Sequence, residues 1–157
     1  MAKVIKPPTP LRWSASVPSV FLAGSIEMGQ AEDWQTTVTN ELAKRDIVIL
    51  NPRRDDWDAT WEQTISNKMF RRQVEWELSA QEKATFILMY FAPATKAPIT
   101  LLELGLAAQS EKLVVCCPDG FWRKGNVDIV CKRYRVPMVS SLQNMVKWIR
   151  RKLDTSS

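Results

Sequence analysis

The chain has no histidine among its 157 residues. This absence excludes Ser/His/Asp triads, Cys/His dyads and most zinc sites, because each of them needs an imidazole. Any acid–base chemistry must therefore come from carboxylates, lysine, tyrosine or cysteine. Tyrosine and cysteine are themselves scarce, with two and three copies.

Long apolar runs are missing as well. None approaches the ~18–20 residues of a membrane-spanning helix, and the start "MAKVIKPPTPLRW" lacks the apolar core of a signal peptide. The cysteines are Cys116, Cys117 and Cys131, an odd number without a CxxC spacing, which favours reduced thiols. We therefore expect a cytoplasmic protein with no membrane partner.

The charge balance is basic but moderate, with a net charge of +5. Basic residues gather late in the chain, in "FWRKGNVDIVCKRYR" and "VKWIRRK". They could form a patch for phosphate or nucleic acid, or a solvated face. Acidic residues interleave elsewhere, which favours the solvated face, so no nucleic-acid polymer is expected as a partner.

Apolar runs and helical periodicities alternate along the chain, whose length fits one domain. We expect strands at 19–24, 46–51, 84–91, 113–118 and 136–139, and helices at 31–45, 67–83, 99–112, 127–134 and 140–153. This order predicts a single-domain α/β fold, a doubly wound, flavodoxin- or Rossmann-like sheet of about five mostly parallel strands with helices on both faces. Residues 1–18 are expected to form a flexible, proline-rich arm before a domain at 19–153.

Ligands on such sheets bind outside the carboxyl ends of the strands. The predicted topology brings loops 24–30, 51–60, 92–98 and 118–126 to that edge. The first loop, in "VFLAGSIEMGQ", matches neither GxGxxG nor GxxxxGK[ST], which argues against a dinucleotide site or a P-loop. Gly24 and Ser25 could still offer backbone N–H groups to an anion or a sugar oxygen. Glu27 could touch the substrate or face solvent.

Glu103, in "PITLLELGLAA", is the sharpest chemical signal. A carboxylate in so apolar a segment is costly to bury without partners. Its place in the first turns of a helix favours the anionic form. This combination suits a nucleophile, although a first-turn acid that only stabilises the helix is an equal alternative. A glycine such as Gly105 costs roughly 1 kcal/mol in a helix interior. Its lack of a side chain could let a backbone or a ligand approach the helix closely.

Other polar residues carry weaker signals. Glu77, in "QVEWELS", borders a helix face and is either a site acid or a solvated glutamate. Asn126 could recognise a hydroxyl or cap the following helix. The loop after the second strand holds three acids and two tryptophans, which could bind a base or hydroxyl or simply form a surface loop: Asp55, Asp56, Trp57, Asp58 and Trp61.

Several stretches together resemble the nucleoside 2-deoxyribosyltransferase family, in its broader branch of deoxyribosyltransferase-like proteins. They are "VFLAGSI", the acid of "WEL", the strand "ATFILMYF", "TLLELGLAA", "NPRRDDWD" and "GFWRKGNVDIV". The resemblance spans roughly residues 19–140. It implies a nucleoside or nucleobase as the small-molecule partner, no metal or organic cofactor, and a homo-oligomer.

The resemblance also implies roles for single residues. Glu103 would be the nucleophile on the anomeric carbon, and Glu77 would bind or protonate the nucleobase. The loop after the second strand would shape the base pocket, through Asn51, Arg53 and Asp58. Asn126 would contact the sugar 5′-hydroxyl, in the family often across a subunit interface. Gly24 and Ser25 would line the sugar site.

Two features depart from the family pattern. The family's strand-one tyrosine, which orients the nucleophile, corresponds here to Phe21, and the loop "ATKAPIT" lacks the aspartate that many members carry. Three functions therefore stay open: nucleobase exchange through a glycosyl-glutamate intermediate, hydrolysis of a nucleoside or nucleotide N-glycosidic bond, and non-catalytic nucleotide binding or sensing. The resemblance favours exchange, and the loop favours a substrate without a 5′-phosphate.

Overall fold

A computed structural model describes residues 1–26, 32–54 and 58–156 of the chain. Its centre is a sheet of six parallel strands in the order β1-β3-β2-β4-β5-β6. The strands are β1 (Lys3–Ile5), β2 (Ser19–Gly24), β3 (Val48–Leu50), β4 (Phe86–Tyr90), β5 (Leu113–Cys116) and β6 (Met138–Val139). The central strands are almost wholly apolar because helices cover both of their faces.

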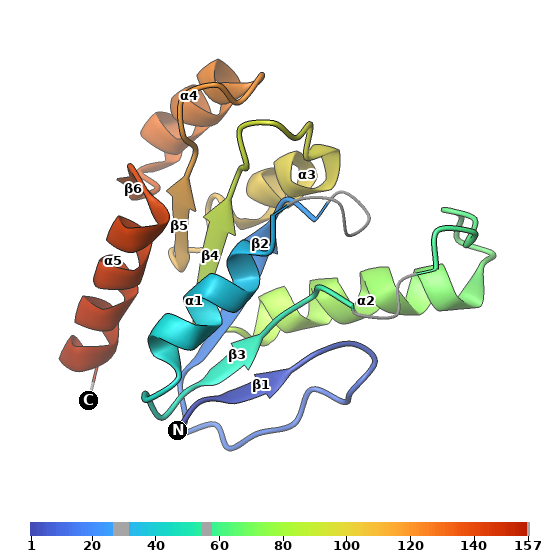
Figure 1. Ribbon diagram of the computed structural model, residues 1–157, viewed down its shortest axis with the longest axis horizontal. Coiled ribbons are helices and arrows are strands. Elements are labelled where there is room, and N and C mark those ends of the chain that lie inside the picture. The colour runs from blue at the N-terminus through green and yellow to red at the C-terminus, as the bar shows by residue number, and fades with distance from the viewer. Residues whose placement is uncertain (27–31, 55–57, 157) are drawn as a thin grey trace.

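The described residues form five helices, which cover both faces of the sheet (Figure 1). They are α1 (Trp34–Leu42), α2 (Lys68–Lys83), α3 (Pro98–Ala107), α4 (Lys124–Tyr134) and α5 (Leu142–Thr155). Side chains of Asp33, Asn67 and Ser141 accept hydrogen bonds from the first free backbone N–H groups of α1, α2 and α5. Such N-caps fix where these helices begin.

Each face of the sheet buries its own apolar cluster. One cluster joins the sheet to α2, α3 and α4 through residues such as Trp76, Leu104 and Val127. The other joins it to α1 and α5 through residues such as Trp34 and Ile149. Trp34, Val38 and Leu42, which follow one another along one side of α1, are fully buried.

The predicted fold class is confirmed, with one more strand than expected. Without β1, the strand order is that of flavodoxin-like proteins, with the reversal between β2 and β4. In parallel sheets of this kind, ligands bind at such a reversal, outside the carboxyl ends of the strands. The sequence placed loops 24–30 and 92–98 at this edge, and the described parts of both lie there.

The expectation of a flexible arm over residues 1–18 is corrected. Residues Lys3–Ile5 form β1, whose strand pairing with β3 extends the sheet at its edge. The following segment lies against α2, where the carbonyl of Thr9 accepts a hydrogen bond from Trp76 Nε1 at 2.8 Å. The carbonyl of Leu11 accepts another from Lys83 Nζ at 2.7 Å. The proline-rich composition favoured a loose arm. These hydrogen bonds join segments far apart in the sequence, so no local pattern predicts them.

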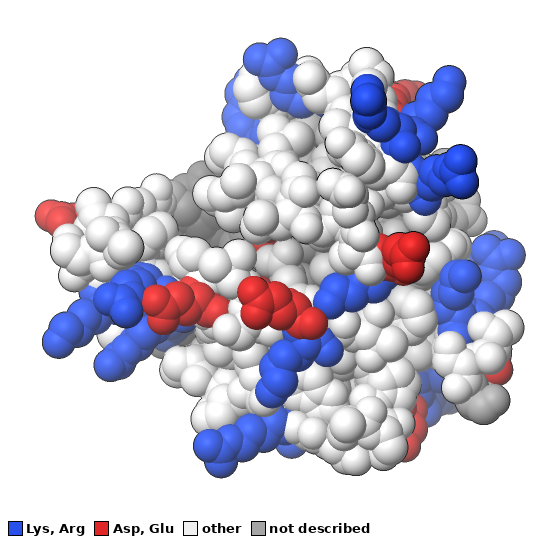
Figure 2. Space-filling view, turned by 180° about the vertical axis from the view of Figure 1, so that it is seen from behind, with Lys and Arg blue, Asp and Glu red and all other residues white. Residues whose placement is uncertain are grey.

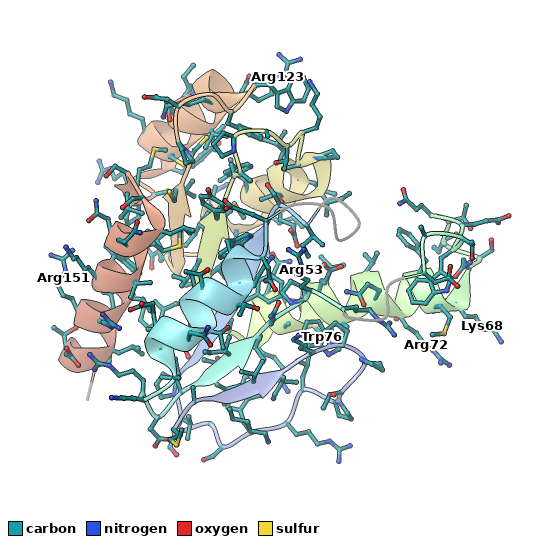
Figure 3. All side chains as sticks on the ribbon, viewed as in Figure 1. Arg53, Lys68, Arg72, Trp76, Arg123 and Arg151 are labelled. Carbon is teal, nitrogen blue, oxygen red and sulfur yellow. The ribbon has the colours of Figure 1, made fainter. Side chains whose placement is uncertain are left out.

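The first half of α2 reaches well beyond the sheet (Figure 1). Lys68 and Arg72 lie on this projecting half, away from the body of the domain (Figure 3). The second half packs on the sheet through Trp76 and Ala80. Among the described residues, no helix combines the length and the apolar character needed to cross a membrane.

Candidate functional site

Glu103 is the sixth residue of α3 and faces α2, with 7% of its surface exposed. The helix starts at Pro98, whose fixed backbone angle suits the first helical position. The neighbours Leu104 and Ala107 anchor α3 to the sheet. The side-chain amide of Gln81, on the last turn of α2, donates a hydrogen bond to Oε2 of Glu103. The acid is thus buried and held by a neutral donor.

Burial raises the pKa of Glu103 to about 7, and the Gln81 hydrogen bond opposes this rise. The sequence suggested that the helix start would favour the ionised form of this acid. The structure corrects this expectation: Glu103 lies in the second turn, where the dipole is weaker, and desolvation dominates. Near neutral pH the carboxyl therefore exchanges between its protonated and its nucleophilic form.

Glu77 faces the same site from α2, one turn before Gln81. Its pKa lies well above its ordinary value, because of burial first and then because of the negative charge on Glu103. The amide of Gln73 offsets part of the rise. The charge on Glu103 thus adds to the burial that disfavours ionisation of Glu77. Two coupled carboxyls of this kind can serve as a nucleophile and a proton donor.

Ser25 secures the loop that precedes α3. Its hydroxyl lies 3.1 Å from the backbone N–H of Ala92, which donates to it, and 2.7 Å from Thr95 Oγ1. The side chain is 1% exposed. In this structure Ser25 therefore joins the ends of β2 and β4, and its predicted contact with substrate stays a prediction.

Gly24 is required by packing at the reversal of the sheet. A Cβ at this position would lie 2.4 Å from the carbonyl oxygen of Tyr90 and 2.6 Å from the Trp34 ring. Real Cβ atoms do not come so close to backbone. The ring of Trp34 also donates a hydrogen bond to the Ser25 carbonyl at 3.3 Å. Because Gly24 has no side chain, the Trp34 ring of α1 can pack directly against the end of β2.

The loop after β3 contributes Asn51, Arg53 and Asp58. Asn51 is 3% exposed, and its side-chain oxygen accepts a hydrogen bond from the Arg53 backbone at 3.0 Å. The Arg53 guanidinium donates to the carbonyl of Glu32 at 3.1 Å and ties this loop to the start of α1. Asp58 is exposed, and hydrogen bonds from Thr60 lower its pKa, so it is poorly suited to donate a proton.

Asn126 lies exposed in the first turn of α4. The residue at the N-cap is Arg123, so the alternative that Asn126 caps this helix is wrong. The preceding loop is held against the loop before α3, because Trp122 Nε1 donates to the Lys96 carbonyl at 2.9 Å. The structure leaves the Asn126 amide at the surface of its own chain.

Four residues raised by the sequence lie outside the described ranges: Glu27, Asp55, Asp56 and Trp57. Trp61 is described, and the guanidinium of Arg54 lies 5.0 Å from its ring centre. This contact supports the role of packing the loop rather than an open stacking surface.

Sequence reasoning missed the importance of Gln73 and Gln81. The buried residues of α2 include both glutamines, beside Trp76 and Ala80. Positions 73, 77 and 81 follow one another at a four-residue spacing, and this Gln-x3-Glu-x3-Gln series was the available signal.

Two open cavities lie elsewhere on the molecule, and neither is lined by Glu77 or Glu103. The first, about 470 Å³, is bounded by residues of α1 and α5 and by Tyr90. The second, about 790 Å³, lies beside α5 and β6. We place the candidate site at the two acids, because burial raises the pKa of both carboxyls. In the described ranges, no cluster of three or more acidic or cysteine side chains could hold a metal ion.

The fold and the acid pair define a flavodoxin-like α/β protein with a two-carboxylate site at the carboxyl edge of its sheet. A sequence model described as "Nucleoside 2-deoxyribosyltransferase like" matches residues 17–121, two thirds of the chain. The chain belongs to this nucleoside 2-deoxyribosyltransferase-like family. A search of curated proteins finds no match. Membership implies nucleoside-related glycosyl transfer and small nucleoside or nucleobase substrates.

Proposed function

We propose that the protein exchanges nucleobases on (deoxy)nucleosides through a covalent glycosyl ester on Glu103. The observation that supports this most directly is the pair of facing acids: Glu103, whose pKa is raised to about 7, and Glu77, whose pKa is raised well above its ordinary value. Family membership supplies the class of substrate. The absence of histidine agrees with a mechanism that uses carboxylates alone.

In the first step, Oε1 of ionised Glu103 attacks C1′ of the nucleoside. The C1′–N bond breaks through an oxocarbenium-like transition state, and Glu77 gives its proton to the leaving base. The glycosyl ester on Glu103 retains the sugar. A second base then attacks C1′ from the opposite face, its N–H proton passes to Glu77, and Glu103 leaves as carboxylate. Two inversions restore the original configuration.

The substrate is proposed to lack a 5′-phosphate. Thr95 provides the only hydroxyl group in the loop 92–97. That hydroxyl is engaged by Ser25 and by the Ala92 carbonyl, at 2.7 and 2.9 Å. The loop thus presents no uncommitted hydroxyl to a phosphate.

The proposal is tested by chromatography of deoxyinosine incubated with the protein, with and without adenine. Deoxyadenosine should form only with adenine, and Glu103→Ala should abolish it. Glu75→Ala is the matched control, because Glu75 lies exposed on α2 in an ion pair with Arg71. Equal release of hypoxanthine with and without adenine would identify a hydrolase instead. No turnover of any nucleoside or nucleotide, together with ligand-induced stabilisation, would identify a binding module.

We further propose that the protein acts as a homo-oligomer through the outer face of α3. Ile99, Leu102 and Leu106 form a stripe on this helix, each at least 60% exposed. Figure 2 shows the surface over α3 without charged side chains, although the chain carries a net charge of +5. Two copies can therefore meet here without repulsion. The exposed Asn126 would then be available to the site of a neighbouring copy.

Gly105 supports the same surface. Nothing lies within 4 Å of a Cβ placed at this position, so packing within the chain does not require glycine there. A glycine in a helix interior nevertheless costs about 1 kcal/mol relative to alanine. A closely approaching helix from a second copy accounts for its presence, because small residues let two helix backbones come together.

A further inference from the structure

We propose that Gln81 is the positioning residue for the nucleophile, holding Oε2 of Glu103 so that Oε1 faces the substrate. This inference rests on the proposed role of Glu103. It goes beyond that role by assigning a function to a glutamine on a different helix. Nothing in the family match identifies this residue.

The geometry carries the assignment. Both side chains are buried, with 6% of Gln81 and 7% of Glu103 exposed. The amide Nε2 of Gln81 donates to Oε2, and among the described residues no other side chain donates to this carboxylate. Oε1 is consequently the oxygen left for attack on carbon. A nucleophile fixed in one rotamer loses less entropy on reaching the transition state.

The strand beneath the site cannot perform this function. On the face of β2 that packs toward α2 and α3, Phe21 and Ala23 have no hydrogen-bond donor, and the Ser19 hydroxyl is engaged at the start of the strand, where it accepts from the Thr85 backbone at 3.1 Å. Phe21 stands where family members are expected to carry the tyrosine that orients the nucleophile. The donor thus reaches Glu103 from the side, from α2, and not from below.

The end of α2 that bears Gln81 is itself anchored. Lys112 Nζ donates to the carbonyls of Gln81, Glu82 and Ala84, at 2.5, 3.0 and 3.1 Å. An ammonium group bonded to the last carbonyls of a helix stabilises its C-terminus. Ala80 packs this turn on the sheet at the same time. The last turn of α2 is therefore a rigid support for the amide.

The first experiment compares Gln81→Met with wild-type protein in base exchange across pH. Methionine keeps the length of the side chain but cannot donate a hydrogen bond. We expect kcat to fall at least about tenfold with KM changed less than about threefold, because binding is retained and orientation is lost. The acidic limb of the pH profile should also move up by about one pH unit, since a hydrogen bond to the ionised form is lost.

Gln109→Met is the matched control, since Gln109 is exposed just after α3. It should leave both the rate and the profile unchanged. A second variant, Gln81→Glu, keeps the shape but donates only when protonated, so its activity relative to wild type should decline as pH rises. Unchanged kcat and pH limb in Gln81→Met, or a decline in Gln81→Glu no steeper than in wild type, would overturn the assignment.

A measurement without substrate separates this inference from the proposed function. The titration of Glu103 is followed by NMR of protein labelled with ¹³C at glutamate carboxyls, and Glu103→Gln identifies its signal. An upward shift of the Glu103 midpoint in Gln81→Met supports the interaction even if no nucleoside is turned over. An unshifted midpoint in a folded and active variant rejects the positioning role while leaving the proposed function intact.

Discussion

Glu77 and Glu103 face each other from α2 and α3, and the charge on Glu103 is one cause of the high pKa of Glu77. Their titrations are therefore linked, and the pair as a whole releases its two protons in separate steps. Between these steps the pair holds one proton. This is the state that the proposed reaction needs.

The first prediction is a bell-shaped pH dependence of kcat/KM. Activity should rise as pH passes about 7, where Glu103 becomes ionised, and fall at higher pH, where Glu77 loses its proton. Steady-state rates of base exchange across the pH range measure both limbs. In Glu77→Gln the falling limb should disappear along with most of the activity. A rate that stays flat through neutral pH would contradict the assigned roles.

The second prediction concerns stability. The pKa of Glu103 is raised on folding from 4.5 to about 7, so the folded state binds more protons between these values, and its stability falls as pH rises through them. Glu103→Gln removes this effect. The variant should gain roughly 2 kcal/mol over wild type between pH 5 and 8 in free energy of unfolding.

Urea unfolding at both pH values gives this difference directly. Glu75→Gln, at an exposed surface ion pair, is the control and should show little dependence on pH relative to wild type. An equal effect of Glu103→Gln at both pH values would mean that the carboxyl is not desolvated in solution.

The third prediction contrasts two glycines. Gly24→Ala should destabilise the protein by about 2–3 kcal/mol, because the added Cβ meets the Tyr90 carbonyl and the Trp34 ring. Gly105→Ala should instead stabilise the isolated chain by up to about 1 kcal/mol, because it improves helix propensity in open space. Thermal unfolding of both variants provides the test, and a tolerated alanine at position 24 would show that β2, β4 and α1 can separate.

The fourth prediction concerns self-association. Leu102→Lys places a charge on the outer face of α3 and should shift the protein from oligomer to monomer in light scattering. Met138→Lys, on the edge strand β6 with 39% exposure, is the control, because lysine is well tolerated on edge strands. Gly105→Ala should weaken association while stabilising the fold. A monomeric wild-type protein would exclude the proposed interface.

Local patterns in the sequence were enough to predict the α/β class and the positions of most elements. Apolar runs such as "VFLA" and "FILMY", helix periodicity and N-caps such as Ser141 each involve residues close together in the sequence. They can therefore be recognised without knowing which distant segments are in contact. Glu103 was found for the same reason, because a single acid in an apolar segment is visible in one window of sequence.

The surroundings of Glu103 depend on the tertiary structure. Gln81 and Glu103 lie 22 residues apart and meet only because α2 and α3 pack on the same face of the sheet. The pairing of β1 with β3 and the close contact at Gly24 likewise depend on distant segments. Burial, which comes from the whole fold, raises the pKa of Glu103. The two carboxylates can be picked out in the sequence. Their raised pKa values and the Gln81 hydrogen bond result from the packing of α2 and α3.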